Sequence, residues 1–363
     1  MPNLQLDTDC EGPLALNDNA FELCREFIKP LGDRFFQQVS RYDDFLAGVA
    51  KKPGYKAGDT LKLILPFLKA HGLTNARIEA YSRKNVTLVP GAEGAFKFLH
   101  GRDFPIFEIS TSYRPFAEAV GLRLGFKKEH IFSTELDLDR YTLSSAEAVE
   151  LQRLQGEIAA APAIEFSPDA VTAADLPAPV AEAIGVLDRI FWERLPAMEI
   201  GVLYQEVNPI GGPEKAKAVS DSLAQTGLSL ADTIYVGDSI TDVQAFEAVR
   251  AGGGLAISFN GNRYAANAAE VVVVADTAWP IAMLVSIFQL WGKEGVLEVA
   301  CPETRAKSRC LVLPEAVIEP IAMGLEGHVF NLYDQNAADW DKVVEESQAM
   351  RAKLRGETVA ALG

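Results

Sequence analysis

The chain has 363 residues, of which 48% are hydrophobic and 23% are charged, as is typical of a globular protein with two or three domains. Its formal net charge of −16 comes from 50 acidic and 34 basic residues. No basic cluster could neutralise a phosphate backbone, so we expect no nucleic-acid partner. A small anion is still allowed, because a divalent cation and helix N-termini can make a local site positive.

The sequence gives no sign of a membrane segment or a secretory leader. No window reaches 18 consecutive apolar residues, and the most apolar stretch, 279–292, predicts a buried helix. Residues 1–4 lack a basic leader region. The four cysteines, at positions 10, 24, 301 and 310, show no metal-binding spacing. We therefore expect a cytoplasmic protein with reduced thiols and no membrane partner.

The first part of the chain predicts a strand, a long helical stretch and then alternating elements. Residues 3–9 predict the strand, and apolar residues at three- and four-residue spacings predict helices between 19 and about 82. The elements predicted next are a helix at 91–100, a strand at 104–109, a helix at 113–124 and a strand near 130–133. Apolar strands alternating with helices indicate a parallel sheet covered on both faces.

The pattern changes over 140–212, where two helices flank a proline-bearing segment, and we interpret this region as an insertion. The alternation then resumes with a helix at 213–226, a strand and loop in "TIYVGDS", a helix from 241, and strands in "GLAISFNG" and "EVVVVAD". After residue 295 we recognise no motif. A strand in "CLVLP" (310–314) and a helix over 339–356 could form a lid, an element of a homodimer or a wrapping tail.

Polar residues follow the predicted strands, where ligands of parallel α/β sheets bind. In "DCEG", Asp9 could attack phosphorus if a cation screens it, and Glu11 could protonate a leaving oxygen and later activate water. Gly12 lets the backbone turn away. In "VGDSITD", Asp238 and Asp242 lie in a strand-to-helix turn that suits a six-oxygen magnesium site.

Two further groups could hold an anion. Ser110 and Thr111 end a strand before a helix, so their hydroxyls could bind a phosphoryl oxygen, although Ser and Thr are also the favoured helix N-caps. "GGPEKAKAV" opens a helix that carries Lys215 and Lys217, although lysines on helices are usually solvated.

In this order, the four motifs resemble those of the haloacid dehalogenase (HAD) superfamily, over roughly residues 3–15, 86–135 and 211–275. The flanking sequence is similar to the phosphoserine-phosphatase-like branch, with the group associated with energy-converting hydrogenases as one option within it. The resemblance implies a Rossmann-like α/β fold, with a parallel sheet core and helical cap insertions. It implies a core of 1–16, 86–139 and 213–295, a cap insertion at 17–85, a second insertion at 140–212 and a C-terminal extension at 296–363.

The resemblance also implies roles for individual residues. Catalysis would use Asp9 as nucleophile, Glu11 as general acid and base, and Lys215; Ser110, Thr111 and Lys215 would bind the substrate phosphate; Asp9, Glu11, Asp238 and Asp242 would form the Mg²⁺ site.

Two positions stay open at this level. The family usually has Asp-x-Asp-Gly, and Asp7 with Asp9 matches the two aspartates, but only Asp9 has Gly12 at the required spacing, so we favour Asp9. Lys215 lies nearer the helix entry than Lys217, and we favour it.

The function implied is Mg²⁺-dependent hydrolysis of a small phosphorylated metabolite through an aspartyl-phosphate. A phosphotransferase of the same fold is one alternative. A non-catalytic or regulatory binding protein is another alternative, although the presence of candidate residues in all four motifs favours catalysis.

Overall fold

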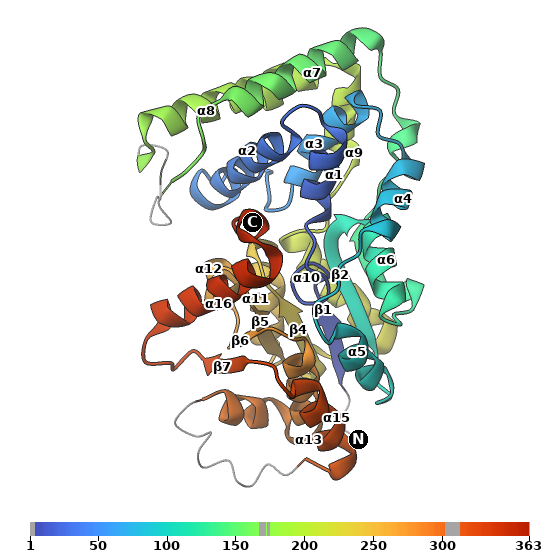
Figure 1. Ribbon diagram of the computed structural model, residues 1–363, viewed down its shortest axis with the longest axis vertical. Helices are drawn as coiled ribbons and strands as arrows, with labels where there is room; N and C mark the ends of the chain where they lie inside the picture. The colour runs from blue at the N-terminus through green and yellow to red at the C-terminus, as the bar shows by residue number, and fades with distance from the viewer. Residues whose placement is uncertain (1–3, 167–171, 173–174, 302–312, 363) are drawn as a thin grey trace.

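The computed structural model describes residues 4–166, 172, 175–301 and 313–362, and a seven-stranded sheet forms its centre (Figure 1). The strands lie in the order β3-β2-β1-β4-β5-β6-β7. Their bounds are β1 (Gln5–Thr8), β2 (Ile106–Tyr113), β3 (Ile131–Thr134), β4 (Thr233–Gly237), β5 (Leu255–Phe259), β6 (Val271–Ala275) and β7 (Phe330–Asp334). Strands β1 to β6 pair in parallel and β7 pairs antiparallel with β6. The predicted Rossmann-like α/β class is confirmed.

Helices cover both faces of the sheet, because alternate residues of the apolar strands point to opposite sides. In β4, Ile234 and Val236 pack with one group of helices, and Tyr235 packs with the other. The first group is α5 (Ala92–His100), α6 (Arg114–Arg123) and α13 (Trp279–Ala300), joined at its edge by α15 (Glu315–Leu325). The second group is α10 (Pro213–Thr226), α11 (Val243–Ala251), α12 (Arg263–Ala268) and α16 (Trp340–Arg355).

A separate layer of helices lies beyond the carboxyl ends of the strands, at the top of Figure 1. It consists of α1 (Asn19–Phe27), α2 (Gly32–Asp44), α3 (Thr60–Ala70), α4 (Asn75–Lys84), α7 (Ser145–Ala160), α8 (Ala178–Asp188) and α9 (Leu203–Glu206). Both insertions contribute to one cluster of buried apolar side chains. Within it, the ring of Phe67 lies 4.8 Å from that of Phe35 and 6.0 Å from that of Phe191, between centroids. The two insertions therefore share one core.

Several predicted elements differ in extent from the structure. Strand β2 continues to Tyr113 instead of stopping at 109, because its pairing with β3 resumes at Tyr113 after a register shift. The helix predicted at 179–195 ends as α8 at Asp188 and continues in π-helical geometry over Arg189–Arg194. Strand β7 was not predicted. Most of the strand predicted at 310–314 lies outside the described residues.

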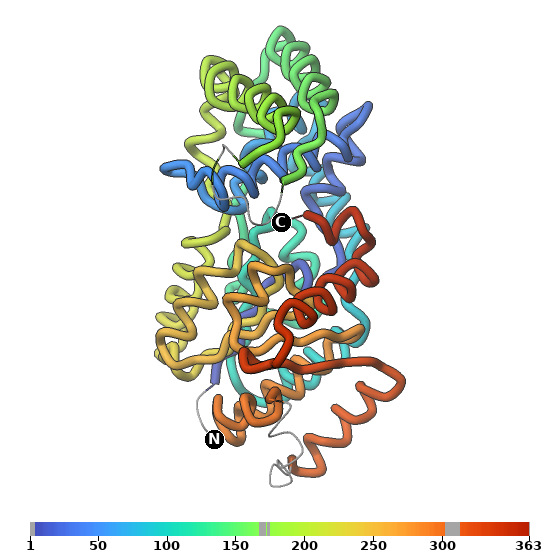
Figure 2. The backbone as a smooth tube through the Cα atoms, turned by 90° about the vertical axis from the view of Figure 1, so that its left-hand side faces the viewer, coloured from blue at the N-terminus to red at the C-terminus, as the bar shows by residue number. Residues whose placement is uncertain are grey.

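The C-terminal segment returns to the strand ends. Helix α16 packs Val343 and Val344 against Val272 and Val274 of β6. The short helix α17 (Glu357–Ala360) follows, and the chain end lies between the helical layer and the sheet in both Figure 1 and Figure 2. Across the described part of the chain, the helices are too short or too polar to cross a bilayer.

Candidate active site

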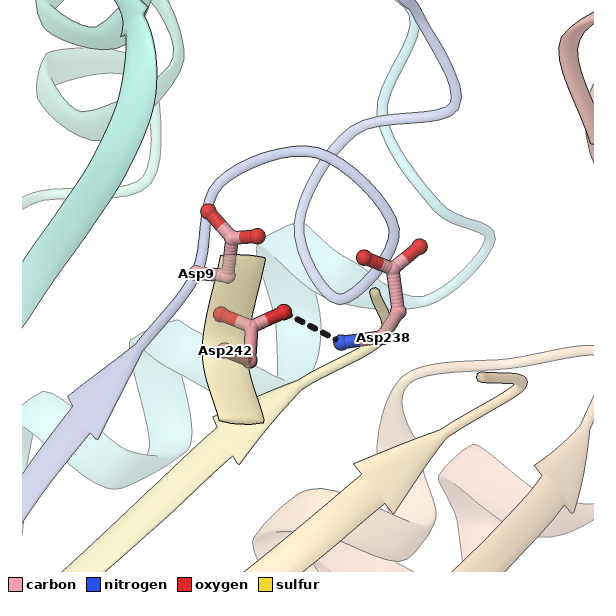
Figure 3. Close-up of side chains that lie close together, drawn as sticks. All are labelled: Asp9, Asp238 and Asp242. Atoms are coloured by element: carbon pink, nitrogen blue, oxygen red, sulfur yellow. Dashed lines mark hydrogen bonds between the residues drawn. The ribbon is translucent and has the colours of Figure 1, made fainter. Parts of the chain in front are cut away.

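Three aspartates meet at the carboxyl ends of β1 and β4 (Figure 3). Asp9 follows β1, and its N–H donates to the Val236 carbonyl at 2.8 Å, which extends the β1–β4 pairing beyond the strand. Asp238 follows β4 directly, and Asp242 ends a 3-10 turn and directly precedes α11. Each aspartate offers one carboxylate oxygen, and these three oxygens lie within 4.8 Å of one another. Neighbouring parallel strands thus unite residues that are more than 200 positions apart.

Asp242 organises the turn after β4. Its Oδ1 accepts hydrogen bonds from Lys215 Nζ at 2.6 Å and from the Tyr235 hydroxyl at 2.8 Å. Its Oδ2 accepts from the backbone N–H of Asp238 at 3.0 Å, drawn dashed in Figure 3, and of Ser239 at 2.9 Å. Both oxygens are therefore engaged with the protein, and Asp242 holds the backbone of Asp238 in place.

The two candidate lysines lie in different surroundings. Lys215 is fully buried, and its Nζ lies 2.7 Å from Asp9 Oδ2 as well as close to Asp242. Burial by itself lowers the pKa of Lys215, but the carboxylates of Asp242 and Asp9 outweigh it and raise the pKa, so the ammonium stays charged. Lys217 is exposed and pairs with Asp221 at 2.5 Å. The structure brings Lys215, and not Lys217, to the aspartates.

Asp7 and Asp9 also lie in different surroundings. The Asp7 carboxylate accepts hydrogen bonds from Gln5 Nε2 at 2.9 Å and from the Ser222 hydroxyl of α10 at 3.0 Å. Burial raises the pKa of Asp7 to about 7. Asp9 instead lines a cavity of about 110 Å³, and Asp238 lines the same cavity. Asp7 is thus a buried sheet residue bonded to a helix, whereas Asp9 faces the cavity.

The charge state of Asp9 depends on its neighbours. Burial is the largest influence and raises the pKa of Asp9 to about 7; Lys215 opposes this rise, and Asp242 and Asp238 add to it. A further cation beside Asp9 would favour its ionised form for the same electrostatic reason.

Glu11 lies in the same cavity but outside the aspartate group. Its Oε1 accepts hydrogen bonds from the Asn19 N–H at 2.9 Å and from the Ser112 hydroxyl at 2.7 Å. Burial, followed by repulsion from Asp18, raises the pKa of Glu11 to about 8. Glu11 is therefore mostly protonated at neutral pH, and the structure places it apart from the three oxygens that could share a metal.

Ser110 and Thr111 line the cavity together with Ser112 and Tyr113, the next two residues of β2. Ser110 is fully buried, and its Oγ accepts a hydrogen bond from the Ser112 N–H at 3.1 Å. The buried Thr111 Oγ1 has no hydrogen-bond partner among the described residues. A buried hydroxyl without a partner is costly, and an oxygen of a bound ligand would satisfy it.

The aspartates suit a hard divalent cation, which prefers carboxylate oxygens. Asp9 and Asp238 fit as direct ligands. Asp242 fits a supporting position, because its oxygens already accept four hydrogen bonds described above. Glu11 does not lie in this oxygen group.

Sequence reasoning missed two residues of the site, Arg351 and Arg355 of α16. Both line the cavity, and both guanidinium groups bind the Asp238 carboxylate, Arg355 at 3.0 Å. Their four-residue spacing places them on one face of the helix. That spacing was the available signal, but it is common on solvated helices, and nothing local identifies what the face contacts.

Comparison with solved structures finds chains of similar fold. The structure of gene product AF1437 from Archaeoglobus fulgidus aligns with a TM-score of 0.79 and 31% identity, over 100% of this chain and 99% of that chain. A HAD family hydrolase from Salmonella enterica serovar Typhi aligns with a TM-score of 0.42 and 14% identity, over 72% of this chain and 64% of that chain, a likeness too low to establish kinship. No family model matches the sequence. No curated protein matches it either.

Proposed function

We propose that this chain, which belongs to the same family as gene product AF1437 from Archaeoglobus fulgidus, is a magnesium-dependent phosphatase of the HAD type that hydrolyses a small phosphomonoester. The observation that carries the proposal is the contact of Lys215 Nζ with Asp9 Oδ2 at 2.7 Å inside the three-aspartate group. An ammonium that touches a cavity-lining carboxylate can hold both a nucleophile and the anion it attacks. The helical layer beyond the strand ends would act as the cap that excludes water.

Asp9 is the proposed nucleophile. Its carboxylate oxygen forms a bond to phosphorus while the bond from phosphorus to the leaving oxygen breaks. Lys215 offsets the negative charge of the phosphoryl group, and the unpartnered Thr111 hydroxyl and the Ser110 hydroxyl donate to its oxygens. Bound Mg²⁺, held by Asp9 and Asp238, would supply further charge neutralisation at the phosphoryl oxygens.

Glu11 is the proposed general acid and base. With its pKa raised to about 8, the protonated carboxyl can give its proton to the leaving oxygen. The resulting carboxylate then takes a proton from the water that attacks the aspartyl-phosphate. The bond from phosphorus to Asp9 breaks, inorganic phosphate leaves, and both carboxyl groups return to their starting states.

Hydrolysis of p-nitrophenyl phosphate and of a panel of metabolite phosphates, in Mg²⁺ and in excess chelator, tests the proposal. We expect turnover in Mg²⁺ to disappear with chelator and in Asp238→Asn. Asp221→Ala is the control, because Asp221 pairs with Lys217 on the surface. Turnover that persists unchanged in chelator would contradict the proposal. Tight phosphate-ester binding without any turnover would favour the regulatory binding protein instead.

A further inference from the structure

Two arginines of α16 share one carboxylate oxygen of the site. Arg351 and Arg355 both bind Asp238 Oδ2, although they lie 113 and 117 residues away in the sequence. The side chains are almost fully buried, with 4% and 5% of their surface exposed, against 3% for Asp238. Buried charges persist in folded proteins when they are paired and hydrogen-bonded. The paired side chains thus form part of the cavity wall.

Each arginine is also held from its other side. Arg351 donates from Nε and Nη2 to the carbonyls of Ala360 and Leu362, both at 3.3 Å. Arg355 donates from Nε to the Leu16 carbonyl at 3.1 Å and from Nη2 to the Asn17 carbonyl at 2.6 Å. Arg355 therefore joins Asp238 to the segment that leads from the sheet into the helical layer. Arg351 joins Asp238 to the last turn of the described chain.

These contacts pair opposite charges among six side chains of the site. Ionised Asp9, Asp238 and Asp242 contribute three negative charges, and Lys215, Arg351 and Arg355 contribute three positive charges, so these six sum to zero. Asp18 also lines the cavity and interacts electrostatically with both arginines. A divalent cation would add two positive charges beside two guanidinium groups, and repulsion between buried charges at such separations is strong. A phosphate dianion that arrives with the cation cancels the two added charges.

We infer that Arg351 and Arg355 compete with Mg²⁺ for the Asp238 carboxylate, so that they oppose the binding of Mg²⁺ by itself and make it depend on a phosphate group. The inference rests on the proposed function, which supplies Mg²⁺ and phosphate as the ligands. In it, both arginines are positioning residues, since they act on Asp238. When Mg²⁺ binds, the guanidinium groups leave Asp238 Oδ2, and α16 with the chain end loosens from the strand ends.

Calorimetric titration of Mg²⁺ into the metal-free full chain tests this competition. We expect Arg351→Gln and Arg355→Gln each to bind Mg²⁺ on the order of tenfold more tightly than the wild type, because one repelling charge is gone. Lys353→Gln is the matched control. It removes the same charge from the same helix, but Lys353 is 63% exposed and lies 3.8 Å from Asp276, so its Mg²⁺ affinity should equal that of the wild type.

Titration of Mg²⁺ in the presence and absence of inorganic phosphate is a second test. In the wild type, phosphate should tighten Mg²⁺ binding, and Mg²⁺ should tighten phosphate binding by the same factor, as linkage requires. In each arginine variant this factor should fall several-fold, because the metal meets less repulsion there when the anion is absent. Equal factors in the wild type and the variants would overturn the inference.

Hydrogen exchange on the unaltered protein covers the case in which a variant fails to fold. Mg²⁺ alone, at a concentration that saturates the wild type, should speed amide exchange over residues 340–362. Unchanged exchange there, or folded arginine variants with wild-type Mg²⁺ affinity, would overturn the inference even if the protein hydrolyses phosphate esters. Tighter Mg²⁺ binding by the variants without any phosphatase turnover would support the inference and contradict the proposed function.

Discussion

A Cβ atom on Gly12 would lie 2.1 Å from Oδ2 of Asp238. The loop after β1 therefore passes directly against the carboxylate at the end of β4. Gly12 has a φ of +99°, a conformation that residues with side chains rarely adopt. The oxygen it faces is the one that binds Arg351 and Arg355, so Asp238 cannot turn away without losing these partners. Glycine is required here both for the backbone conformation and for the close approach.

Gly12→Ala should displace Asp238 and thereby weaken Mg²⁺ binding at least about tenfold. Separately, the strained backbone should lower the free energy of unfolding by roughly 1–3 kcal/mol. Gly54→Ala is the matched control, since Gly54 has a φ of +76° and a Cβ atom added there would have no neighbour within 4 Å. Thermal unfolding should show a loss in both variants, larger for Gly12→Ala because Asp238 also loses its arginine partners, whereas Mg²⁺ titration should show a defect only for Gly12→Ala. An equal metal affinity in the two variants would contradict the role of the close approach.

Lys215→Gln should lower phosphatase turnover by at least about 10²-fold, because the ammonium that pairs with Asp9 and Asp242 is lost from a buried site. Lys217→Gln should stay near wild-type turnover, since Lys217 is exposed and pairs with Asp221. Initial rates with p-nitrophenyl phosphate measure both. The opposite ranking would assign the motif lysine to position 217.

Asp9→Asn should abolish turnover and prevent beryllofluoride, a phosphoryl mimic, from binding. Asp7→Asn should retain substantial turnover, because the asparagine oxygen can accept from Gln5 while its amide donates to the Ser222 hydroxyl, which can donate to the Val219 carbonyl instead. Fluorine NMR of the beryllofluoride complex and initial rates test the pair. A mimic that binds Asp9→Asn but not Asp7→Asn would move the nucleophile to Asp7.

Glu11→Gln should slow turnover by roughly 10²–10⁴-fold, the usual contribution of a general acid and base. Its amide can still accept from Asn19 and Ser112, so the fold should be retained. Substrates with good leaving groups need less acid assistance, and with them phosphoenzyme should accumulate in rapid-quench experiments. Wild-type turnover in this variant would show that Glu11 is only part of an acidic turn and does not act as general acid and base.

The raised pKa of Glu11 predicts a pH-dependent stability in metal-free protein. With a folded pKa of about 8 against an ordinary value of 4.5, the native state holds a proton that the unfolded state has lost between these values. The free energy of unfolding therefore falls as pH rises through this window. Urea unfolding at pH 6 and pH 8.5 in chelator should show the fall. Glu11→Gln, which cannot titrate, should show a smaller fall, and identical slopes would refute the assignment.

The sequence by itself determined the α/β class, the parallel core and the positions of most strands. The near-continuous apolar runs of β4, β5 and β6 predict strands buried on both faces, and α10 has the bounds predicted for the helix at 213–226. These features depend on short-range patterns. Strand β7 was missed for the same reason: it pairs antiparallel at the sheet edge, and its polar residues interrupt the continuous apolar run that a local pattern would show.

Only the tertiary structure decided which polar residues meet. Local sequence left Asp7 and Asp9 as alternatives, and the structure separates them because one bonds to α10 and the other reaches the cavity. Glu11 was expected beside the aspartates, but hydrogen bonds to Asn19 and Ser112 hold it elsewhere. Arg351 and Arg355 could not be assigned to the site from sequence, because their partner is more than a hundred residues away. Such a contact depends on how α16 packs against β6, and periodicity within one helix carries no information about that packing.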